Sequence, residues 1–357
     1  RGVFKLIVVT GGSGFIGKNF ILEWFRNSEE PLINIDKLTY AASENVLTGA
    51  KFGSKYVFIK EDIANSDALS EIFGSAKPRC IINFAAETHV DRSIASPENF
   101  ISTNILGTSK LLETVRKYQS NLDAKSREEF KYIHISTDEV YGSLRIGEPA
   151  FVESSKFEPN SPYAASKASS DHLVHAYSKT YDVNTITVNC SNNYGPFQFP
   201  EKLIPLSILN ALRGEPLRIY GDGKQIRDWL HVHDHCSAIR ALLNHGSVGA
   251  SYNVGGDNEK QNIDVVNKIC SLLDQKKPRS DGAPYSNLIK FVEDRPGHDF
   301  RYAVDSTKIL RDVGWQSAET FVSGLEKTVE WYLNNEAWLE TVSSGSLNVW
   351  LKQQYGS

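Results

Sequence analysis

The chain has 357 residues, of which 40% are hydrophobic and 23% charged, and its formal net charge is −4. This length suits one large or two ordinary domains with a sizeable core. A slightly acidic chain lacks the basic surface that nucleic acid binding needs, and no apolar run approaches the ~18 residues of a membrane span. We therefore expect a soluble globular protein with no nucleic acid and no membrane among its partners.

The four cysteines, Cys80, Cys190, Cys236 and Cys270, are scattered and show no C-x-x-C spacing. This pattern is typical of neither a disulfide framework nor a zinc site. The first apolar stretch, at residues 5–9, is also too short for a signal sequence. The cysteine pattern therefore predicts a reducing compartment, and we expect the protein in the cytoplasm.

Six short apolar runs alternate with stretches of helical periodicity. The runs cover residues 5–9, 32–35, 56–60, 80–84, 132–136 and 185–189, and clear helical stretches cover 104–118 and 165–181. This alternation is typical of a doubly wound parallel sheet, the Rossmann arrangement of α/β proteins. After residues 192–196 the rhythm becomes irregular, with turns at 221–223 and 255–257. We predict an NAD-binding domain over 1–190 and a smaller C-terminal α/β substrate-binding lobe over 191–357, with the chain free to cross back between them.

A glycine-rich turn follows the first run. Gly11, Gly14 and Gly17 lie between the strand and a helical stretch, and Asp36 ends the second strand. Such glycines allow a tight turn and a close approach of backbone to a pyrophosphate, and an acid about 20 residues later accepts hydrogen bonds from the adenosine ribose. Because a carboxylate repels a 2′-phosphate, we predict NAD rather than NADP, although Lys37 adjoins Asp36. Further residues expected beside the dinucleotide are Phe15, Ile16, Lys37, Leu38, Thr39, Asp62, Ile63, Phe84, Ala85, Ala86 and Thr103.

A tyrosine and a lysine follow the predicted helix start at 160–162. Tyr163 and Lys167 are four residues apart and therefore share one helix face. An ammonium beside a phenol favours the phenolate, so Tyr163 can act as a base in hydride transfer while Lys167 also reaches the nicotinamide ribose. The pair alone occurs by chance in many helices, but with the upstream glycine turn it predicts nicotinamide-dependent redox chemistry.

Two adjacent acids end the fifth run. Thr137, Asp138 and Glu139 lie at the carboxyl end of a predicted parallel strand, where ligands of such sheets bind. Eliminating water from a sugar needs a general base for a C–H proton and a general acid for the leaving hydroxide, and the two carboxyls can supply both. Thr137 can hydrogen-bond the sugar O4. The alternative is a solvated acidic turn with no part in the chemistry.

Several segments together resemble the dTDP-glucose 4,6-dehydratases, which are extended short-chain dehydrogenases/reductases. They are 36–40, 85–93, 136–142, 190–196, 200–205 and 294–299. The resemblance implies that Tyr163 takes the O4 proton as the C4 hydride passes to tightly bound NAD, that Glu139 removes the C5 proton and that Asp138 protonates the departing C6 hydroxyl. Return of the hydride to C6 then gives dTDP-4-dehydro-6-deoxy-glucose, a deoxysugar precursor on routes such as that to dTDP-rhamnose. The resemblance also implies a homodimer through two long helices, including residues 165–181.

The same resemblance implies which residues meet the substrate. Thr88 and Asn192, with Thr137, should face the hexose, and Asn193 should lie by the nicotinamide. A diphosphate on an acidic protein needs local cations, and arginine offers planar bidentate donors. The nucleotide pocket and the diphosphate are assigned Lys202, Leu203, Tyr220, Arg227, Asn262, Arg295 and His298. Two features depart from the family pattern: Thr88 stands where many relatives have serine, and the loop over 144–151 is shorter than in some relatives.

Three histidines, His231, His233 and His235, alternate beside Asp234. On a strand they would share one face, as in a zinc site. Because the expected redox chemistry needs no metal, we predict none, and we expect Asp234 to cap a helix that begins near Cys236.

Three rival functions remain. An NAD-dependent nucleotide-sugar 4-epimerase or decarboxylase shares the fold, the cofactor and the Tyr163/Lys167 pair, but does not require both acids. A 4,6-dehydratase for another nucleotide would keep the acids. A non-catalytic, dinucleotide-sensing scaffold would need none of these side chains, and their presence argues against it.

Overall fold

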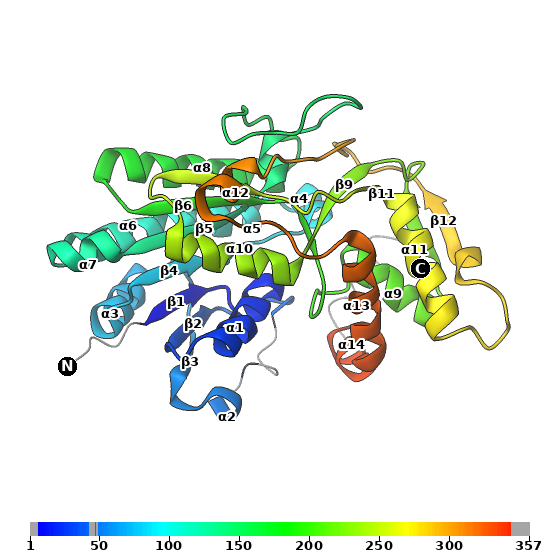
Figure 1. Ribbon diagram of the computed structural model, residues 1–357, viewed down its shortest axis with the longest axis horizontal. Coiled ribbons are helices and arrows are strands. Elements are labelled where there is room, and N and C mark those ends of the chain that lie inside the picture. Colours follow the sequence, from blue (N-terminus) through cyan, green and yellow to red (C-terminus); the bar gives the residue numbers. More distant parts are fainter. Residues whose placement is uncertain (1–5, 43–46, 48, 344–357) are drawn as a thin grey trace.

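The computed structural model describes residues 6–42, 47 and 49–343, and its elements form two lobes that lie side by side (Figure 1). The larger lobe holds a seven-stranded, fully parallel sheet with the order β10-β6-β5-β4-β1-β2-β3. Its strands are β1 (Ile7–Thr10), β2 (Leu32–Asp36), β3 (Tyr56–Lys60), β4 (Cys80–Asn83), β5 (Lys131–Thr137), β6 (Thr185–Cys190) and β10 (Ala250–Val254). All six predicted runs are strands of this sheet, so the predicted doubly wound α/β fold is confirmed.

Helices cover both faces of this sheet. On β1, Val8 packs in one core cluster while Ile7 and Val9 pack in another, because successive side chains of a strand point to opposite faces. Burial on both faces explains why the strands read as continuous apolar runs rather than as alternating ones. One face is covered by α3 (Ser66–Ala76), α6 (Thr108–Ser120) and α8 (Pro162–Tyr181), and the other by α1 (Phe15–Asn27), α10 (Val232–His245) and α12 (Thr307–Val313).

Helix α8 starts at a strong local signal. The Ser161 hydroxyl accepts from the Ala164 amide at 3.1 Å, and Pro162 occupies the first turn, where its missing N–H costs nothing. Helix α6 begins later than the predicted residue 104, because a π-helical stretch, η2 (Ile101–Gly107), precedes it. The other short elements of this lobe are α2 (Gly49–Phe52), η1 (Gly53–Lys55), α4 (Val90–Ala95), α5 (Glu98–Phe100), α7 (Ala124–Glu129) and η3 (Asp138–Tyr141).

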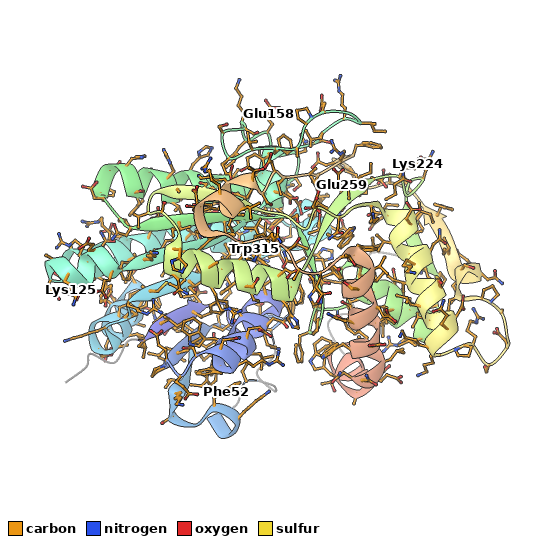
Figure 2. The ribbon with its side chains drawn as sticks, in the orientation of Figure 1. Phe52, Lys125, Glu158, Lys224, Glu259 and Trp315 are labelled. Atoms are coloured by element: carbon orange, nitrogen blue, oxygen red, sulfur yellow. The ribbon has the colours of Figure 1, made fainter. Side chains whose placement is uncertain are left out.

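The smaller lobe has its own core around two small sheets. A three-stranded sheet has the order β11-β9-β7, and a two-stranded sheet pairs β12 with β8. Its elements are β7 (Asn192–Tyr194), α9 (Leu203–Leu212), β8 (Leu217–Tyr220), β9 (Ile226–His231), β11 (Glu259–Gln261), α11 (Asn262–Lys276), η4 (Tyr285–Leu288), β12 (Ile289–Val292), α13 (Phe321–Asn334) and α14 (Glu336–Ser343). Side chains fill both lobes, with Lys125 in the larger lobe and Lys224 in the smaller one (Figure 2).

The smaller lobe is not one continuous stretch of chain. After β9 the chain returns to the larger lobe, where α10 packs on α1 and β10 pairs with β6. Helix α12 then packs against α10 and β10. The sequence analysis allowed for such a return, and the division at residues 190 and 191 stays a prediction.

The histidine-rich segment joins β9 to α10. His231 ends β9 and caps α10, with its Nδ1 3.4 Å from the His233 amide, so the three histidines do not alternate along one strand. The prediction that Asp234 caps a helix beginning near Cys236 is wrong, because α10 begins at Val232 and Asp234 lies inside its first turn. Its carboxylate accepts from the backbone amides of residues 318 and 319 instead. Within the described ranges no cluster of histidine, cysteine and acidic residues could hold a metal ion, and no helix is long and apolar enough to cross a membrane.

Candidate functional site

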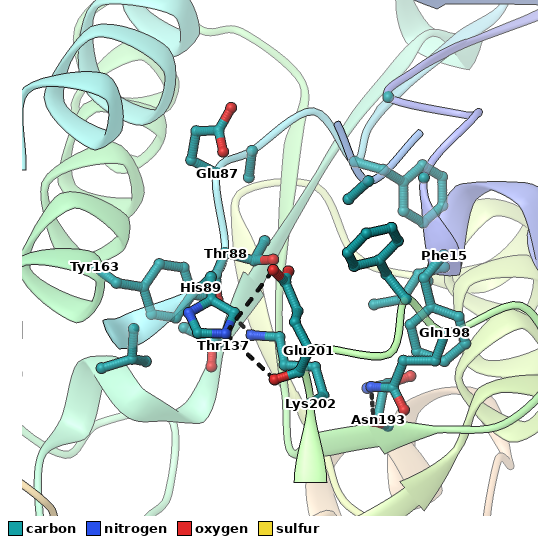
Figure 3. Close-up of a pocket in the computed structure, with 18 of the residues that line it drawn as sticks. Phe15, Glu87, Thr88, His89, Thr137, Tyr163, Asn193, Gln198, Glu201 and Lys202 are labelled. Atoms are coloured by element: carbon teal, nitrogen blue, oxygen red, sulfur yellow. Dashed lines mark hydrogen bonds and ion pairs between the residues drawn. The ribbon is translucent and has the colours of Figure 1, made fainter. Parts of the chain in front are cut away.

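A cavity of about 400 Å³ lies at the carboxyl edge of the large sheet and is lined by residues of both lobes. Every residue predicted for cofactor, catalysis or substrate lines this cavity, except Leu38 and Asp138. Leu38 has a φ of 60° and donates its amide to the Asp36 carboxylate at 2.8 Å, so its contribution comes from its backbone. Asp138 is 1% exposed and lies behind the cavity wall. Figure 3 shows Tyr163 and Thr137 on one side of the cavity and Phe15 and Asn193 on another.

The glycine-rich turn is shaped by close backbone contacts. Gly11 has a φ of 72°, and a Cβ there would lie 2.4 Å from the Ala85 amide nitrogen. A Cβ on Gly17 would lie 2.6 Å from the Gly11 carbonyl oxygen. Gly14 differs, because its Cβ would meet only the Gly11 carbonyl, at 3.4 Å. Two glycines are therefore demanded by packing, whereas Gly14 leaves room beside the start of α1, where no side chain caps the free amides.

Asp36 completes this end of the cavity. Its carboxylate accepts from the Ser13 amide at 3.0 Å and from the Leu38 amide, which fixes its orientation at the end of β2. Burial raises its pKa, and these backbone bonds together with Lys18 oppose the rise. The Lys37 ammonium is 3.1 Å from the Thr103 hydroxyl and 3.5 Å from the Asp62 carboxylate. Lys37 is thus held by two other predicted cofactor residues.

The phenol of Tyr163 lies deep in the cavity. Burial raises its pKa well above 10, the Glu139 carboxylate adds to the rise, and a hydrogen bond with Thr137 opposes it. The Lys167 ammonium donates to the Ile135 carbonyl at 2.8 Å, and burial lowers its pKa. Thr137 thus stabilises the phenolate in this structure, and the expectation that Lys167 favours the phenolate stays a prediction.

The two adjacent acids occupy different surroundings on η3. Asp138 accepts from the Thr137 hydroxyl at 3.3 Å, and its second oxygen has no hydrogen-bond partner among the described residues. Burial, together with the Glu139 and Asp228 carboxylates, raises the pKa of Asp138 well above 3.8, which favours its protonated form.

Glu139 faces the cavity instead and meets cations. Burial raises its pKa, while Arg295, Lys202 and Arg227 act in the opposite direction. A carboxyl whose pKa is raised by burial but lowered by nearby cations is suited to take a proton and later release it. The surroundings therefore favour the protonated form more strongly at Asp138 than at Glu139, which suits one carboxyl to act as an acid and the other as a base.

Cations from distant segments gather at the substrate end. Arg227 is 5% exposed and donates to the backbone carbonyls of Ile226 at 2.8 Å and Asp299 at 2.9 Å. The Lys202 ammonium donates to the Thr88 carbonyl at 2.7 Å, and His298 lies 2.6 Å from the Asp294 carboxylate. This end of the cavity suits an anionic ligand.

Two asparagines of β7 connect the ends of the cavity. The Asn193 side chain donates to the Ser191 carbonyl at 2.9 Å, and its oxygen lies 3.0 Å from His235 Nδ1. The neighbouring Asn192 has a buried side-chain oxygen without a partner among the described residues. Asn193 is thus held rigidly, while Asn192 offers an acceptor to a ligand.

Sequence reasoning missed several polar residues that line the same cavity. They are Glu87, His89, Asp91, Gln198, Glu201 and Arg218. Glu87, His89 and Asp91 flank Thr88, and Glu201 precedes Lys202, so each belongs to a segment in which a neighbour had already been assigned. The signal available was therefore their position beside predicted site residues.

Comparisons with known proteins place the chain among nucleotide-sugar enzymes. A family model described as GDP-mannose 4,6 dehydratase matches residues 8–328. A dTDP-glucose 4,6-dehydratase from Xanthomonas campestris pv. campestris strain B100 is 52% identical over 340 residues, which is 95% of this chain and 96% of that protein.

Solved structures give the same result. The dTDP-glucose 4,6-dehydratase of Bacillus anthracis, solved in complex with NAD, is 44% identical, with a TM-score of 0.83 and coverage of 95% and 99% of the two chains. The dTDP-glucose 4,6-dehydratase of Streptomyces venezuelae, solved with NAD and TYD bound, is 40% identical, with a TM-score of 0.84 and coverage of 94% and 99%.

Proposed function

Because this chain belongs to the dTDP-glucose 4,6-dehydratase family, we propose that it dehydrates dTDP-glucose to dTDP-4-dehydro-6-deoxy-glucose as an NAD-dependent hydro-lyase. The observation that carries the proposal is the pair Asp138 and Glu139 beside Tyr163, because burial and two carboxylates favour the protonated form of Asp138 while three cations oppose that form of Glu139. Both roles are required for elimination. An epimerase or decarboxylase would not require the pair.

The residues at the glycine-rich end fit NAD. The space beside Gly14 and the backbone amides at the start of α1, which no side chain caps, suit a pyrophosphate. The fixed Asp36 carboxylate suits ribose hydroxyls. Lys37 is held by Asp62 and Thr103, so it leaves the charge of Asp36 to act against a 2′-phosphate. When bound, NAD accepts a hydride from C4 of the sugar and returns it to C6.

Tyr163 and Thr137 act at the sugar O4. The phenolate of Tyr163 takes the O4 proton, and the Thr137 hydroxyl can stabilise that phenolate when it turns its hydrogen from Asp138 to Tyr163. Lys167 lies one helical turn away on the same face of α8, where its ammonium can meet the nicotinamide ribose. The proton leaves O4 as the C4 carbonyl forms.

Glu139 and Asp138 then act on C5 and C6. The 4-keto group acidifies the C5 proton, and Glu139 removes it. Asp138 gives its own proton to the departing C6 hydroxyl, and water leaves. Glu139 returns its proton to C5, and a proton equivalent to the one that Tyr163 took from O4 passes to Asp138, so that the phenolate and both carboxyls regain their starting states.

The diphosphate and nucleoside occupy the cation-rich end. Arg227 and Arg295 supply planar donors, and Lys202 supplies a third positive charge. Thymine recognition is part of the proposal, since the family model is described by a guanine nucleotide while the relatives act on a thymine one. dTDP-glucose, UDP-glucose and GDP-mannose offered in parallel should give product with dTDP-glucose alone.

The test of the acid pair uses the amide variants Glu139→Gln and Asp138→Asn. Each should leave C4 oxidation possible but slow elimination by about 10²- to 10⁴-fold, so the near-ultraviolet absorbance of the reduced cofactor should build up on the enzyme. Glu158→Gln is the control, because Glu158 is exposed on a surface loop (Figure 2). Normal turnover of both amide variants would contradict the assignment. In heavy water the product should carry deuterium at C5.

We also propose that the protein is a cytoplasmic homodimer. The apolar residues Ile101 and Leu106 of η2 and Tyr181 of α8 are 49%, 57% and 51% exposed on neighbouring helices. A second copy would cover such a surface. All four cysteines are free, which suits a reducing compartment. Size-exclusion chromatography with light scattering should give twice the chain mass, and Leu106→Glu should reduce it to the monomer.

A further inference from the structure

Helix α4 forms two crossed ion pairs with the smaller lobe. Asp91 accepts from Arg295 Nη1 at 3.0 Å, and the next residue, Arg92, donates its Nε–H to Glu201 at 3.3 Å. One short helix thus presents an acid and a base in succession, and the other lobe presents the opposite charges. We call Asp91 and Arg92 the α4 latch.

Each carboxylate of these pairs also accepts from a tyrosine. Tyr220 donates its hydroxyl to Asp91 at 3.0 Å, and Tyr40 donates to Glu201 at 3.0 Å. The guanidinium of Arg92 stacks 3.9 Å above the Tyr40 ring. The side chains of Asp91 and Glu201 are only 9% and 3% exposed, so both pairs are shielded from water and from salt.

The latch adjoins the residues proposed to bind substrate. Lys202 follows Glu201 and donates to the Thr88 carbonyl, while His89 Nε2 lies 3.3 Å from the Glu201 carbonyl (Figure 3). Residues 88–92 of one lobe are therefore joined to residues 201–202 of the other along the cavity wall. The positions of Thr88 and Lys202 depend on the same set of contacts.

The latch also governs where the positive charge of Arg295 lies. Although burial acts to raise the pKa of Asp91, Arg295 and its other neighbours hold it below 3.8, so the pair is ionised. Arg295 is at the same time the strongest of the cations acting on Glu139. Without the Asp91 charge, the guanidinium would be held less firmly for a diphosphate.

We propose that Asp91 and Arg92 are positioning residues that latch α4 to the smaller lobe and hold Arg295 and Lys202 in place for the diphosphate of the nucleotide sugar. This inference rests on the proposed function. An arginine fixed by one carboxylate keeps its remaining N–H donors aimed at a ligand, and less side-chain freedom is lost on binding.

The test compares thymidine 5′-diphosphate with thymidine as calorimetric ligands of the NAD-loaded enzyme. Asp91→Asn keeps the shape of the side chain and removes its charge. Its dissociation constant for thymidine 5′-diphosphate should rise about tenfold, while that for thymidine, which has no diphosphate, should change less than about twofold. In turnover of dTDP-glucose, KM should rise about as much and kcat should stay within about twofold.

Asp67→Asn is the matched control. Asp67 is an acid in the first turn of α3, as Asp91 is in α4, but it is exposed and lies outside the cavity. Its variant should bind both ligands as the wild type does. Failure of the wild type to bind thymidine 5′-diphosphate would contradict the proposed function itself. Normal binding by the wild type with equal or tighter binding by Asp91→Asn would overturn the latch alone.

Arg92→Lys tests the other half of the latch at lower risk to folding, because it keeps the charge. It loses the planar contact with Glu201 and the stack on Tyr40, so affinity for thymidine 5′-diphosphate should fall about threefold or more while NAD content stays at the wild-type level. If Asp91→Asn is not recovered folded, this variant decides the question. Unchanged diphosphate affinity in Arg92→Lys would then overturn the proposal.

Discussion

The two ends of the cavity are built from different parts of the chain. At the cofactor end the walls are mainly backbone: Gly11 lies in close contact with residues 84 and 85 after β4, and Gly17 lies in close contact with Gly11. At the substrate end the walls are charged side chains, among them Arg227 and Arg295, that come from segments far apart in the sequence. Local sequence therefore determines the first end, and the assembled fold determines the second.

This difference implies different responses to substitution. A backbone wall has no room to adjust, so a change there should act on folding and cofactor binding together. A wall of charged side chains should respond to substitution in small steps, because each cation contributes only a part of the electric field that acts on the ligand. Tyr163 lies where the two ends meet, and it should show a third response, in which the chemistry alone is lost.

Tyr163→Phe should have the largest effect. The variant removes the hydroxyl that takes the O4 proton, so kcat should fall about 10³-fold at unchanged NAD content. Tyr141→Phe is the control, since Tyr141 is also buried and its hydroxyl bonds Asn253 at 2.8 Å outside the cavity. That variant should cost about 1 kcal/mol of stability with little change in kcat. Equal losses in both would show that Tyr163 acts through packing.

Gly11→Ala should have the next largest effect, on the backbone end. Its Cβ would lie 2.4 Å from the Ala85 amide nitrogen at a φ of 72°, so we expect destabilisation of about 3 kcal/mol and loss of bound NAD. Gly53→Ala is matched in conformation, with a φ of 61°, but nothing lies within 4 Å of its Cβ. It should cost only about 1 kcal/mol and keep NAD. Thermal unfolding and cofactor content measure both effects, and full NAD content in Gly11→Ala would contradict the backbone description of this end.

The contrast also explains what could be predicted from sequence. Six strands, the glycine turn and Asp36 were predicted because each signal lies within one short segment. The return of β10 to the large sheet could be allowed for but not located, since pairing between residues 250–254 and β6 leaves no local mark.

The missed site residues have the same cause. Asp91 and Glu201 face the cavity only because α4 and the segment before α9 meet across the lobes. The different surroundings of Asp138 and Glu139 likewise arise from Asp228 and Arg295, which are distant in sequence. The family resemblance assigned a role to each of the two acids, whereas the surroundings that make them differ are visible only in the fold.

A buried histidine where the two ends meet gives a smaller, pH-dependent effect. Burial lowers the pKa of His235 to about 3, against 6.5 in an unfolded chain. Below pH 6.5 the unfolded chain therefore binds a proton that the folded protein does not, and the free energy of unfolding falls as pH decreases, by about 1.4 kcal/mol per unit. From pH 6.5 to 5 the loss is about 2 kcal/mol for this site.

The measurement for His235 is a difference between variants, because the raised pKa values of Asp36, Asp138 and Glu139 act on stability in the opposite direction. His235→Gln keeps a donor for Asn193 without a titrating ring, so its urea unfolding free energy should fall less between pH 6.5 and 5 than that of the wild type. His175→Gln, at an exposed position of α8, should keep the wild-type slope. Identical slopes in all three proteins would show that His235 accepts a proton in the folded state.

Arg295→Lys should have the smallest effect. It tests whether substrate binding weakens only in part when one cation at this end of the cavity is changed. The variant keeps a positive charge near Glu139 but loses the planar fork, of which one branch holds Asp91. Because the charge survives, KM for dTDP-glucose should rise only about tenfold, with NAD content and unfolding temperature near those of the wild type. Arg301→Lys is the control, since Arg301 also donates to a carboxylate, that of Glu259, but outside the cavity, so its variant should leave KM unchanged. Loss of NAD or of the fold in Arg295→Lys would mean that this cation is as rigidly required as Gly11, and the contrast between the two ends of the cavity would fail.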